Sequence, residues 1–280
     1  MRIRSTDGFI ADARIKGKKL KPVCGDQVCA ELIKNEDDWL ITKLLPRRNE
    51  LSRPNMRGKV EVLAANIDLV IVVAAATPEP DWFIVDRYVC AAENMNADAL
   101  IVYNKTDLAP PDKEFDDYQR IGYESLTCSV AQQRNIHQVN DRIGLRTAVM
   151  VGQSGVGKSS IINSLTEGEE QRTAAVSDKT SEGRHTTVNS VMLELDGGGR
   201  IIDSPGVRDY APALDTPEQV AVGFREIAAA GLNCRFANCR HLREPNCAVK
   251  TGVESGGISS RRYESYRRLY ALTERLGDSK

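Results

Sequence analysis

Short, almost continuous apolar runs mark the central part of the chain, and each is followed by a polar loop. The runs cover residues 67–76, 99–103 and 147–152, and a helix-like stretch at 84–94 lies between the first two. Runs without alternation are typical of parallel strands that are buried on both faces. The central part therefore predicts an α/β unit with a mostly parallel sheet.

The two ends of the chain show other patterns. Residues 9–15 and 26–33 are short strand-like pieces separated by glycine, asparagine and aspartate turns, which predicts a small β-barrel. The basic, turn-rich segment 46–54 is interpreted as a linker that either contacts phosphate or is simply solvated. Residues 259–276 predict a helix whose tyrosines form a packing face. Its arginines are the better candidates for phosphate contact: Arg261, Arg262, Arg267 and Arg268.

The most specific motif joins the third apolar run to a helix-forming stretch and reads Gly-x-x-x-x-Gly-Lys-Ser, from Gly152 to Ser159. Glycines allow the backbone N–H groups of such a loop to point inward at a phosphate. Lys158 can then reach the β- and γ-phosphates, and the Ser159 hydroxyl can ligate Mg²⁺. A glycine-rich turn without a ligand is the alternative, but the strand, loop and helix context favours a phosphate site.

A second motif, Asn104-Lys105-Thr106-Asp107, follows the run at 99–103. Asp107 can accept hydrogen bonds from N1–H and the exocyclic amine of guanine, while Asn104 faces O6 and N7. Adenine lacks that amine, a mismatch worth on the order of 10⁴ in discrimination. Alone the tetrapeptide is often a surface turn, but beside a phosphate loop it predicts a guanine site. Residues 127–129 are a weaker candidate for another loop at the base edge.

Two later segments are expected to sense the γ-phosphate. His185 precedes Thr186 and Thr187, and either threonine could complete the Mg²⁺ shell. Asp203 follows a predicted hairpin and is expected to hold Mg²⁺ through water, while the N–H of Gly206 contacts the γ-phosphate.

The order of these motifs is unusual, because the Asn-Lys-x-Asp loop precedes the phosphate loop. Most small GTPases have the reverse order. The same sheet can be built either way, since circular permutation only moves the termini. The segment after Gly206 then connects directly to the C-terminal region.

That region carries four soft or borderline metal ligands within fourteen residues: Cys234, Cys239, His241 and Cys247. Their types and spacing predict a closed Cys₃His zinc site. This segment is polar and has little apolar area to bury. Metal binding would therefore supply its folding energy. Three free thiols and a chance histidine are the alternative.

Charge is unevenly distributed although the net charge is only −1. Residues 1–60 hold 14 Lys or Arg against 8 Asp or Glu, residues 231–280 hold 10 against 5, and the remainder holds 14 against 26. Basic ends around an acidic centre indicate contact with a polyanion, unless the unevenness is chance. No apolar stretch reaches the ~20 residues of a membrane helix and no signal-peptide core follows Met1, so the expected location is the cytosol. Seven cysteines also fit a reducing compartment.

In its permuted motif order, barrel-like start and Cys-Cys-His-Cys cluster, the chain resembles the RsgA family of circularly permuted GTPases. The resemblance implies an OB-fold RNA-binding domain at 1–60, a permuted GTPase domain at 61–215 and an α-helical zinc-binding domain at 216–280. It also implies a monomer that binds GTP and GDP with Mg²⁺, one zinc ion, and the rRNA of the small ribosomal subunit. Hydrolysis of GTP during late subunit assembly would be stimulated by the subunit.

Residue roles follow from the same resemblance. The guanine site would consist of Asn104, Lys105, Thr106 and Asp107. The phosphate and Mg²⁺ site would consist of Gly152, Gln153, Ser154, Gly155, Val156, Gly157, Lys158, Ser159 and Ser160. Val207 stands where many GTPases place a water-orienting glutamine, so intrinsic hydrolysis should be slow. His185 is the candidate for that task, the alternative being a histidine without a role. The N-terminus is short for the family, so the barrel is expected to lack part of its first strand.

Two other classes of protein were compatible with parts of the pattern. A metabolic P-loop kinase or ATPase would use Lys158 equally well, and Asn104 and Asp107 are what argue against it. A zinc-containing nucleic-acid-binding regulator with a vestigial nucleotide site is the other.

Overall fold

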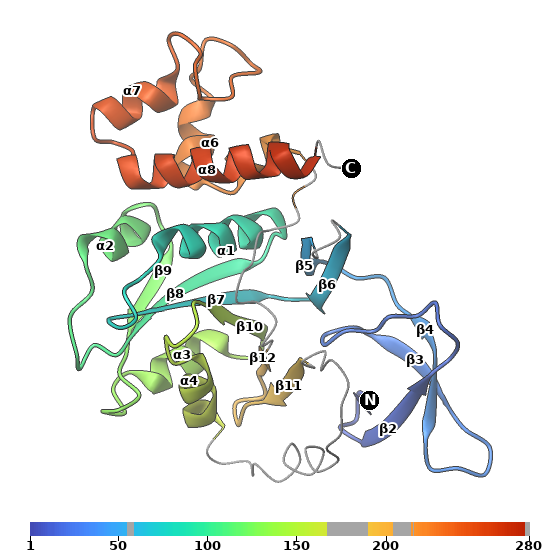
Figure 1. Cartoon of the computed structure of the whole chain (residues 1–280). Coiled ribbons are helices and arrows are strands. Elements are labelled where there is room, and N and C mark those ends of the chain that lie inside the picture. Colours follow the sequence, from blue (N-terminus) through green and yellow to red (C-terminus); the bar gives the residue numbers. More distant parts are fainter. Residues whose placement is uncertain (55–58, 167–189, 204–213, 215, 278–280) are drawn as a thin grey trace.

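The computed structural model describes residues 1–54, 59–166, 190–203, 214 and 216–277. Figure 1 shows three parts: a small N-terminal sheet, a central α/β layer, and a group of helices at the C-terminal end. Within the described residues, no helix is long and apolar enough to cross a membrane.

The central part is a six-stranded sheet in the order β11-β12-β10-β7-β8-β9. All neighbouring strands are parallel except β11 and β12, which confirms the predicted mostly parallel sheet. The strands are β7 (Leu69–Ala75), β8 (Asp98–Asn104), β9 (Glu124–Thr127), β10 (Thr147–Gly152), β11 (Val191–Glu194) and β12 (Arg200–Asp203).

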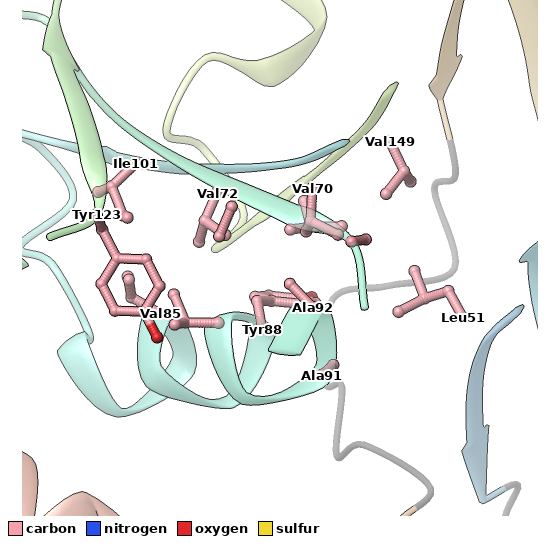
Figure 2. Packing of buried hydrophobic residues seen from close by; sticks show 14 of the residues in the cluster. Leu51, Val70, Val72, Val85, Tyr88, Ala91, Ala92, Ile101, Tyr123 and Val149 are labelled. Carbon is pink, nitrogen blue, oxygen red and sulfur yellow. The ribbon is translucent and has the colours of Figure 1, made fainter. Parts of the chain in front are cut away.

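Helices cover both faces of this sheet, which explains why β7 is apolar at every position. Val70 and Val72 point to a core shared with α1 and α2, whereas Ile71 and Val73 point to a core shared with α3 and α4. The first of these cores is drawn in Figure 2, where Val70 and Val72 lie opposite Tyr88 of α1. Burying one such side chain contributes about 1.5–3 kcal/mol. The helices are α1 (Trp82–Asn94), α2 (Lys113–Arg120), α3 (Ile136–Ile143) and α4 (Lys158–Leu165).

The N-terminal sheet is a half barrel with the strand order β1-β2-β4-β3. Strands β2 and β4 are parallel, and the other two pairs are antiparallel. This sheet corresponds to the predicted N-terminal barrel. Its strands are β1 (Arg2–Arg4), β2 (Ile10–Ile15), β3 (Val28–Leu32) and β4 (Trp39–Leu44).

The interpretation of 46–54 as a linker is wrong for its second half. Strand β5 (Glu50–Pro54) pairs antiparallel with β6 (Val60–Ala65), and Leu51 lies opposite Ala64. The physical reason is burial: Leu51 is fully buried and belongs to the same core as Val70. One well-placed leucine thus outweighs the turn-forming composition around it.

The C-terminal part contains α5 (Glu218–Val222), α6 (Arg225–Gly231), α7 (Ala248–Glu254) and α8 (Ser260–Gly277). The predicted packing role of the tyrosines of α8 is confirmed, since Tyr266 and Tyr270 are buried against Phe224 and Ile227.

The prediction that Arg261 and Arg262 contact phosphate is wrong. Arg262 is 1% exposed and pairs with Asp86 of α1 and Glu226 of α6. Arg261 also pairs with Asp86, at 2.7 Å. Both arginines lie on the side of α8 that covers α1, where the buried carboxylate of Asp86 pairs with each of them.

Candidate functional site

Three of the polar loops predicted to bind nucleotide start at the same edge of the central sheet. Strand β8 ends at Asn104, β10 at Gly152 and β12 at Asp203. Since β8, β7, β10 and β12 are parallel neighbours, their carboxyl ends lie together. The crevice outside the carboxyl ends of such strands is where open α/β sheets bind ligands.

Two glycines of the phosphate loop are required by close approaches. Gly152 has φ +137°, and a Cβ there would lie 2.2 Å from the carbonyl oxygen of Val73. Gly157 has φ +94°, and a Cβ there would lie 2.4 Å from Nδ2 of Asn104. A side chain at Gly152 would force the loop away from β7, and one at Gly157 would displace the side chain of Asn104.

Lys158 begins α4 and turns back over the loop. Its Nζ donates to the carbonyl oxygens of Gly152 at 2.7 Å and Gln153 at 2.8 Å. Burial raises the pKa of Asp203, and the positive charge of Lys158 partly offsets that effect. The ammonium group is thus held in the phosphate loop and acts electrostatically on the carboxylate at the end of β12.

The Asn-Lys-x-Asp loop is bound directly to the phosphate loop. Asn104 is 1% exposed, and its Nδ2 donates to the carbonyl oxygen of Val156 at 3.0 Å. Lys105 Nζ donates to the carbonyl oxygens of Gly155 at 2.8 Å and Thr77 at 2.7 Å. These bonds bring together two motifs that are about fifty residues apart in the chain and fix the spacing between a base-binding and a phosphate-binding loop.

Residues 127–129, the weaker candidate, lie against this loop. The Ser129 hydroxyl donates to Oδ1 of Asp107, and Thr106 Oγ1 donates to the carbonyl oxygen of Cys128 at 2.9 Å. The Cys128 thiol donates to Oδ1 of Asn104 at 3.5 Å, and burial raises its pKa to about 12, so it stays protonated. The side chains of Asn104 and Asp107, which are the two that could contact a base edge, therefore have a fixed orientation.

Sequence reasoning missed one segment of this site, the turn that follows β7. The backbone N–H of Asp81 donates to Oε1 of Gln153 at 3.3 Å, and Asp81 also caps α1 through the N–H groups of Phe83 and Ile84. An aspartate directly before a helical pattern is an N-cap signal that could have indicated this turn. Four predicted site residues lie outside the described part of the chain: His185, Thr186, Thr187 and Gly206.

A second site lies in the C-terminal part. The candidate ligand atoms of Cys234, Cys239, His241 and Cys247 all lie within 4.8 Å of one another. The Sγ atoms of Cys234 and Cys247 are 3.8 Å apart, and each lies 3.5 Å from His241 Nδ1. Tetrahedral zinc with its usual bond lengths requires about 3.8 Å between sulfurs and about 3.6 Å between sulfur and nitrogen. Three of the predicted four residues thus have spacings that fit a Cys₃His metal centre, and Cys239 lies within 4.8 Å of them.

Surrounding residues hold this ligand set. Tyr263 and Tyr266 donate from their hydroxyl groups to the carbonyl oxygens of His241 at 2.6 Å and Arg240 at 2.7 Å. Burial lowers the pKa of His241, although Glu244 opposes the effect, and this favours the neutral imidazole that a metal needs. Glu244 itself accepts from the backbone N–H groups of Arg240, Leu242 and Arg243. It was missed, although it is the one carboxylate between Cys234 and Cys247.

The phosphate loop, the Asn-Lys-x-Asp loop bound to it and their reversed order along the chain define a circularly permuted GTPase. Residues 44–212 match the model of the RsgA GTPase family. The chain therefore belongs to the RsgA GTPase family, as its motifs suggested.

Individual relatives agree with this. The chain is 40% identical over 243 residues to the small ribosomal subunit biogenesis GTPase RsgA of Azotobacter vinelandii, covering 85% of this chain and 71% of the relative. For the protein of that name from Pseudomonas aeruginosa the identity is 36% over 275 residues, with 96% and 81% covered.

Solved structures give the same result. YjeQ from Thermotoga maritima superposes with a TM-score of 0.73 at 26% identity, covering 96% of this chain and 91% of that protein. YloQ, described as a circularly permuted GTPase, superposes with a TM-score of 0.70 at 25% identity, covering 98% and 88%.

Proposed function

We propose that this protein binds GTP and GDP with Mg²⁺ and hydrolyses GTP to GDP and phosphate during late maturation of the small ribosomal subunit, which stimulates the reaction. The names of the relatives support the place of action. The observation that carries the nucleotide chemistry is the direct bonding of Asn104 and Lys105 to the phosphate loop. This contact sets a base-binding and a phosphate-binding loop at a fixed separation.

In this proposal the residues of the phosphate loop, Gly152 through Ser160, surround the phosphates. The N–H groups of the loop and of the first turn of α4 donate to phosphate oxygens, and Lys158 exchanges its loop carbonyls for the β- and γ-phosphates. Asp107, oriented by Ser129, accepts from N1–H and the amine of guanine. Thr106 fixes the loop between Asn104 and Asp107.

Mg²⁺ accompanies the nucleotide and would neutralise charge between the β- and γ-phosphates. The Ser159 hydroxyl, the carboxylate of Asp203 through water, and Thr186 or Thr187 would hold it. His185 would orient the attacking water, and the N–H of Gly206 would contact the γ-phosphate. With Val207 in place of a glutamine, hydrolysis without the subunit would be slow.

The Cys₃His centre would bind one zinc ion per chain. Closed tetrahedral sets of sulfur and nitrogen ligands favour zinc over other metal ions. Residues 1–60 and 216–280 would form an OB-fold and a zinc-binding domain that contact rRNA, on either side of a GTPase domain at 61–215. The protein would act as a monomer in the cytoplasm, where ribosomal subunits are assembled.

GTP turnover measured with and without purified small ribosomal subunits tests the proposal. We expect slow turnover alone, a clear increase with small subunits, and little with large subunits as the matched control. Lys158→Ala should abolish the increase, because it removes the phosphate contact while leaving the surfaces for RNA unchanged. The proposal would be contradicted if the small subunit did not change the turnover rate, or if Lys158→Ala left the increase intact.

A further inference from the structure

The loop between α6 and α7 exposes apolar side chains that nothing in the described chain covers. It lies at the end of the helical part, away from the central sheet (Figure 1). Leu232 is 88% exposed and Phe236 is 40% exposed, and both lie within four residues of the ligand Cys234. Exposed apolar side chains with charged residues around them are one of the features that mark a binding surface, so the charges of this loop decide what it can bind.

The charges around these side chains are mostly positive. Residues 232–247 contain three arginines and one glutamate, and all three arginines are exposed: Arg235, Arg240 and Arg243. The guanidinium carbon of Arg235 lies 5.6 Å from the centre of the Phe236 ring. Within the described residues, neither Arg235 nor Arg243 forms an ion pair, whereas Arg240 pairs with Glu274 at 3.6 Å. Glu244 offsets one of these three positive charges, but its carboxylate oxygens accept from backbone N–H groups, and Glu244 pairs with none of the arginine side chains in the described part of the chain.

The loop is also held in shape. The hydroxyl groups of Tyr263 and Tyr266 bind two of its carbonyl oxygens, and the N–H of Cys239 donates to the carbonyl oxygen of Phe236 at 3.1 Å. A bound metal would fix the same segment further. An exposed ring on a restrained backbone loses little conformational entropy on binding, so its contact area contributes to affinity.

We propose that Leu232, Arg235 and Phe236 form a tip that binds an unpaired nucleotide of single-stranded RNA. The Phe236 ring stacks on the base, Leu232 covers the edge of the stack, and Arg235 and Arg243 contact the flanking phosphates. An aromatic ring beside unpaired arginines fits this partner because every base has a flat face and every linkage a negative charge. The inference rests on the proposed function only in naming ribosomal RNA as the source of that nucleotide.

Fluorescence anisotropy with the full, zinc-loaded chain and a labelled single-stranded RNA of about 12 nucleotides tests this, with the same RNA in a duplex as comparison. Phe236→Ala should weaken binding to the single strand about tenfold and binding to the duplex far less, since stacking needs an unpaired base. Phe236→Tyr should retain wild-type affinity. Arg243→Gln should make the plot of log affinity against log salt concentration less steep. The expected change is the amount that one lost phosphate contact produces. Leu145→Ala, at a leucine 82% exposed between α3 and β10, is the matched control.

Unchanged single-strand affinity in both Phe236→Ala and Leu232→Ala would overturn the inference. The inference would also be overturned if Phe236→Ala no longer co-sedimented with the subunit but kept its affinity for RNA, because the tip would then bind a ribosomal protein. Zinc content and thermal unfolding are measured for each variant, and if Phe236→Ala loses its metal, Leu232→Ala alone decides. GTP turnover of the wild-type protein with subunits is the separate readout: if it does not rise, the proposed function fails whatever the RNA result.

Discussion

Arg262 of α8 donates from Nη1 to Oδ1 of Asp86 of α1 at 2.5 Å, and both side chains are almost completely buried. Tyr118 of α2 donates to the same oxygen at 2.6 Å, and Arg262 also pairs with Glu226 of α6 at 2.6 Å. One buried carboxylate thus joins the C-terminal helices to the helices that cover the central sheet. Such a network fixes one arrangement of charges, since every buried group needs its partners.

We therefore expect Asp86→Ala to lower the free energy of unfolding by about 3–5 kcal/mol, because it leaves the Arg262 guanidinium buried with half of its partners and the Tyr118 hydroxyl with none. Urea unfolding followed by circular dichroism measures the loss. Asp116→Ala, at an exposed aspartate of α2, is the control and should change stability by less than about 0.5 kcal/mol. A loss below about 1 kcal/mol in Asp86→Ala would show that the network is not a structural link.

A second prediction concerns the nucleotide base. Asp107→Asn should lower the preference for GDP over ADP by at least about tenfold, because an amide cannot accept both hydrogen bonds of guanine that a carboxylate accepts. Ser129→Ala should have the same direction with a smaller size, since it removes the donor that orients Asp107. Calorimetry with the two nucleotides measures both effects, again with Asp116→Ala as the control. Equal affinity of the wild-type protein for GDP and ADP would favour an ATPase or kinase instead.

Much of the fold was predictable because it rests on local patterns. Uninterrupted apolar runs identified β7 and β8, and the spacing of Cys234, Cys239, His241 and Cys247 identified a cluster that could hold a metal ion. Motif spacing also identified the phosphate loop, because its glycines meet steric demands set by the adjacent strand and by Asn104.

What could not be predicted depends on contacts between distant segments. Nothing near Arg261 or Arg262 in the sequence indicates that Asp86, about 175 residues earlier, lies under α8. An arginine-rich helix therefore suggested phosphate contact, although two of its five arginines pair with buried carboxylates. Strand β5 was missed for the same reason, because Leu51 gains its burial from the core around Val70 and not from its neighbours in sequence.

The metal centre gives a third prediction. Purified protein should contain about one equivalent of zinc, and Cys247→Ser should lose most of it, because a closed site needs all four ligands. Since α6 and α7 flank the ligand loop, chelation should reduce helical circular dichroism and the protection of these helices from hydrogen exchange, but leave GDP affinity unchanged. Cys29→Ser is the control, because Cys29 is an exposed cysteine in β3 of the N-terminal sheet. A fully folded C-terminal part without metal would contradict the prediction.

The last prediction uses the pKa of Asp203, which burial raises above its ordinary value of 3.8 while Lys158 partly offsets the rise. A carboxyl group with a raised pKa binds protons more readily in the folded chain, so its contribution to stability falls as the pH rises from 3.8 through the folded pKa. Asp203→Asn should therefore raise the melting temperature of the nucleotide-free protein at pH 7 but not below pH 3.8.

The same variant should weaken binding of Mg²⁺ to the GTP complex at pH 7, because the charge that would hold the ion is lost. Differential scanning fluorimetry and Mg²⁺ titrations measure the two effects, and the variant Asp196→Asn, in the turn between β11 and β12, is the control. A destabilising effect of Asp203→Asn at pH 7 without nucleotide would contradict this prediction. The carboxylate would then already have a stabilising partner in the absence of Mg²⁺.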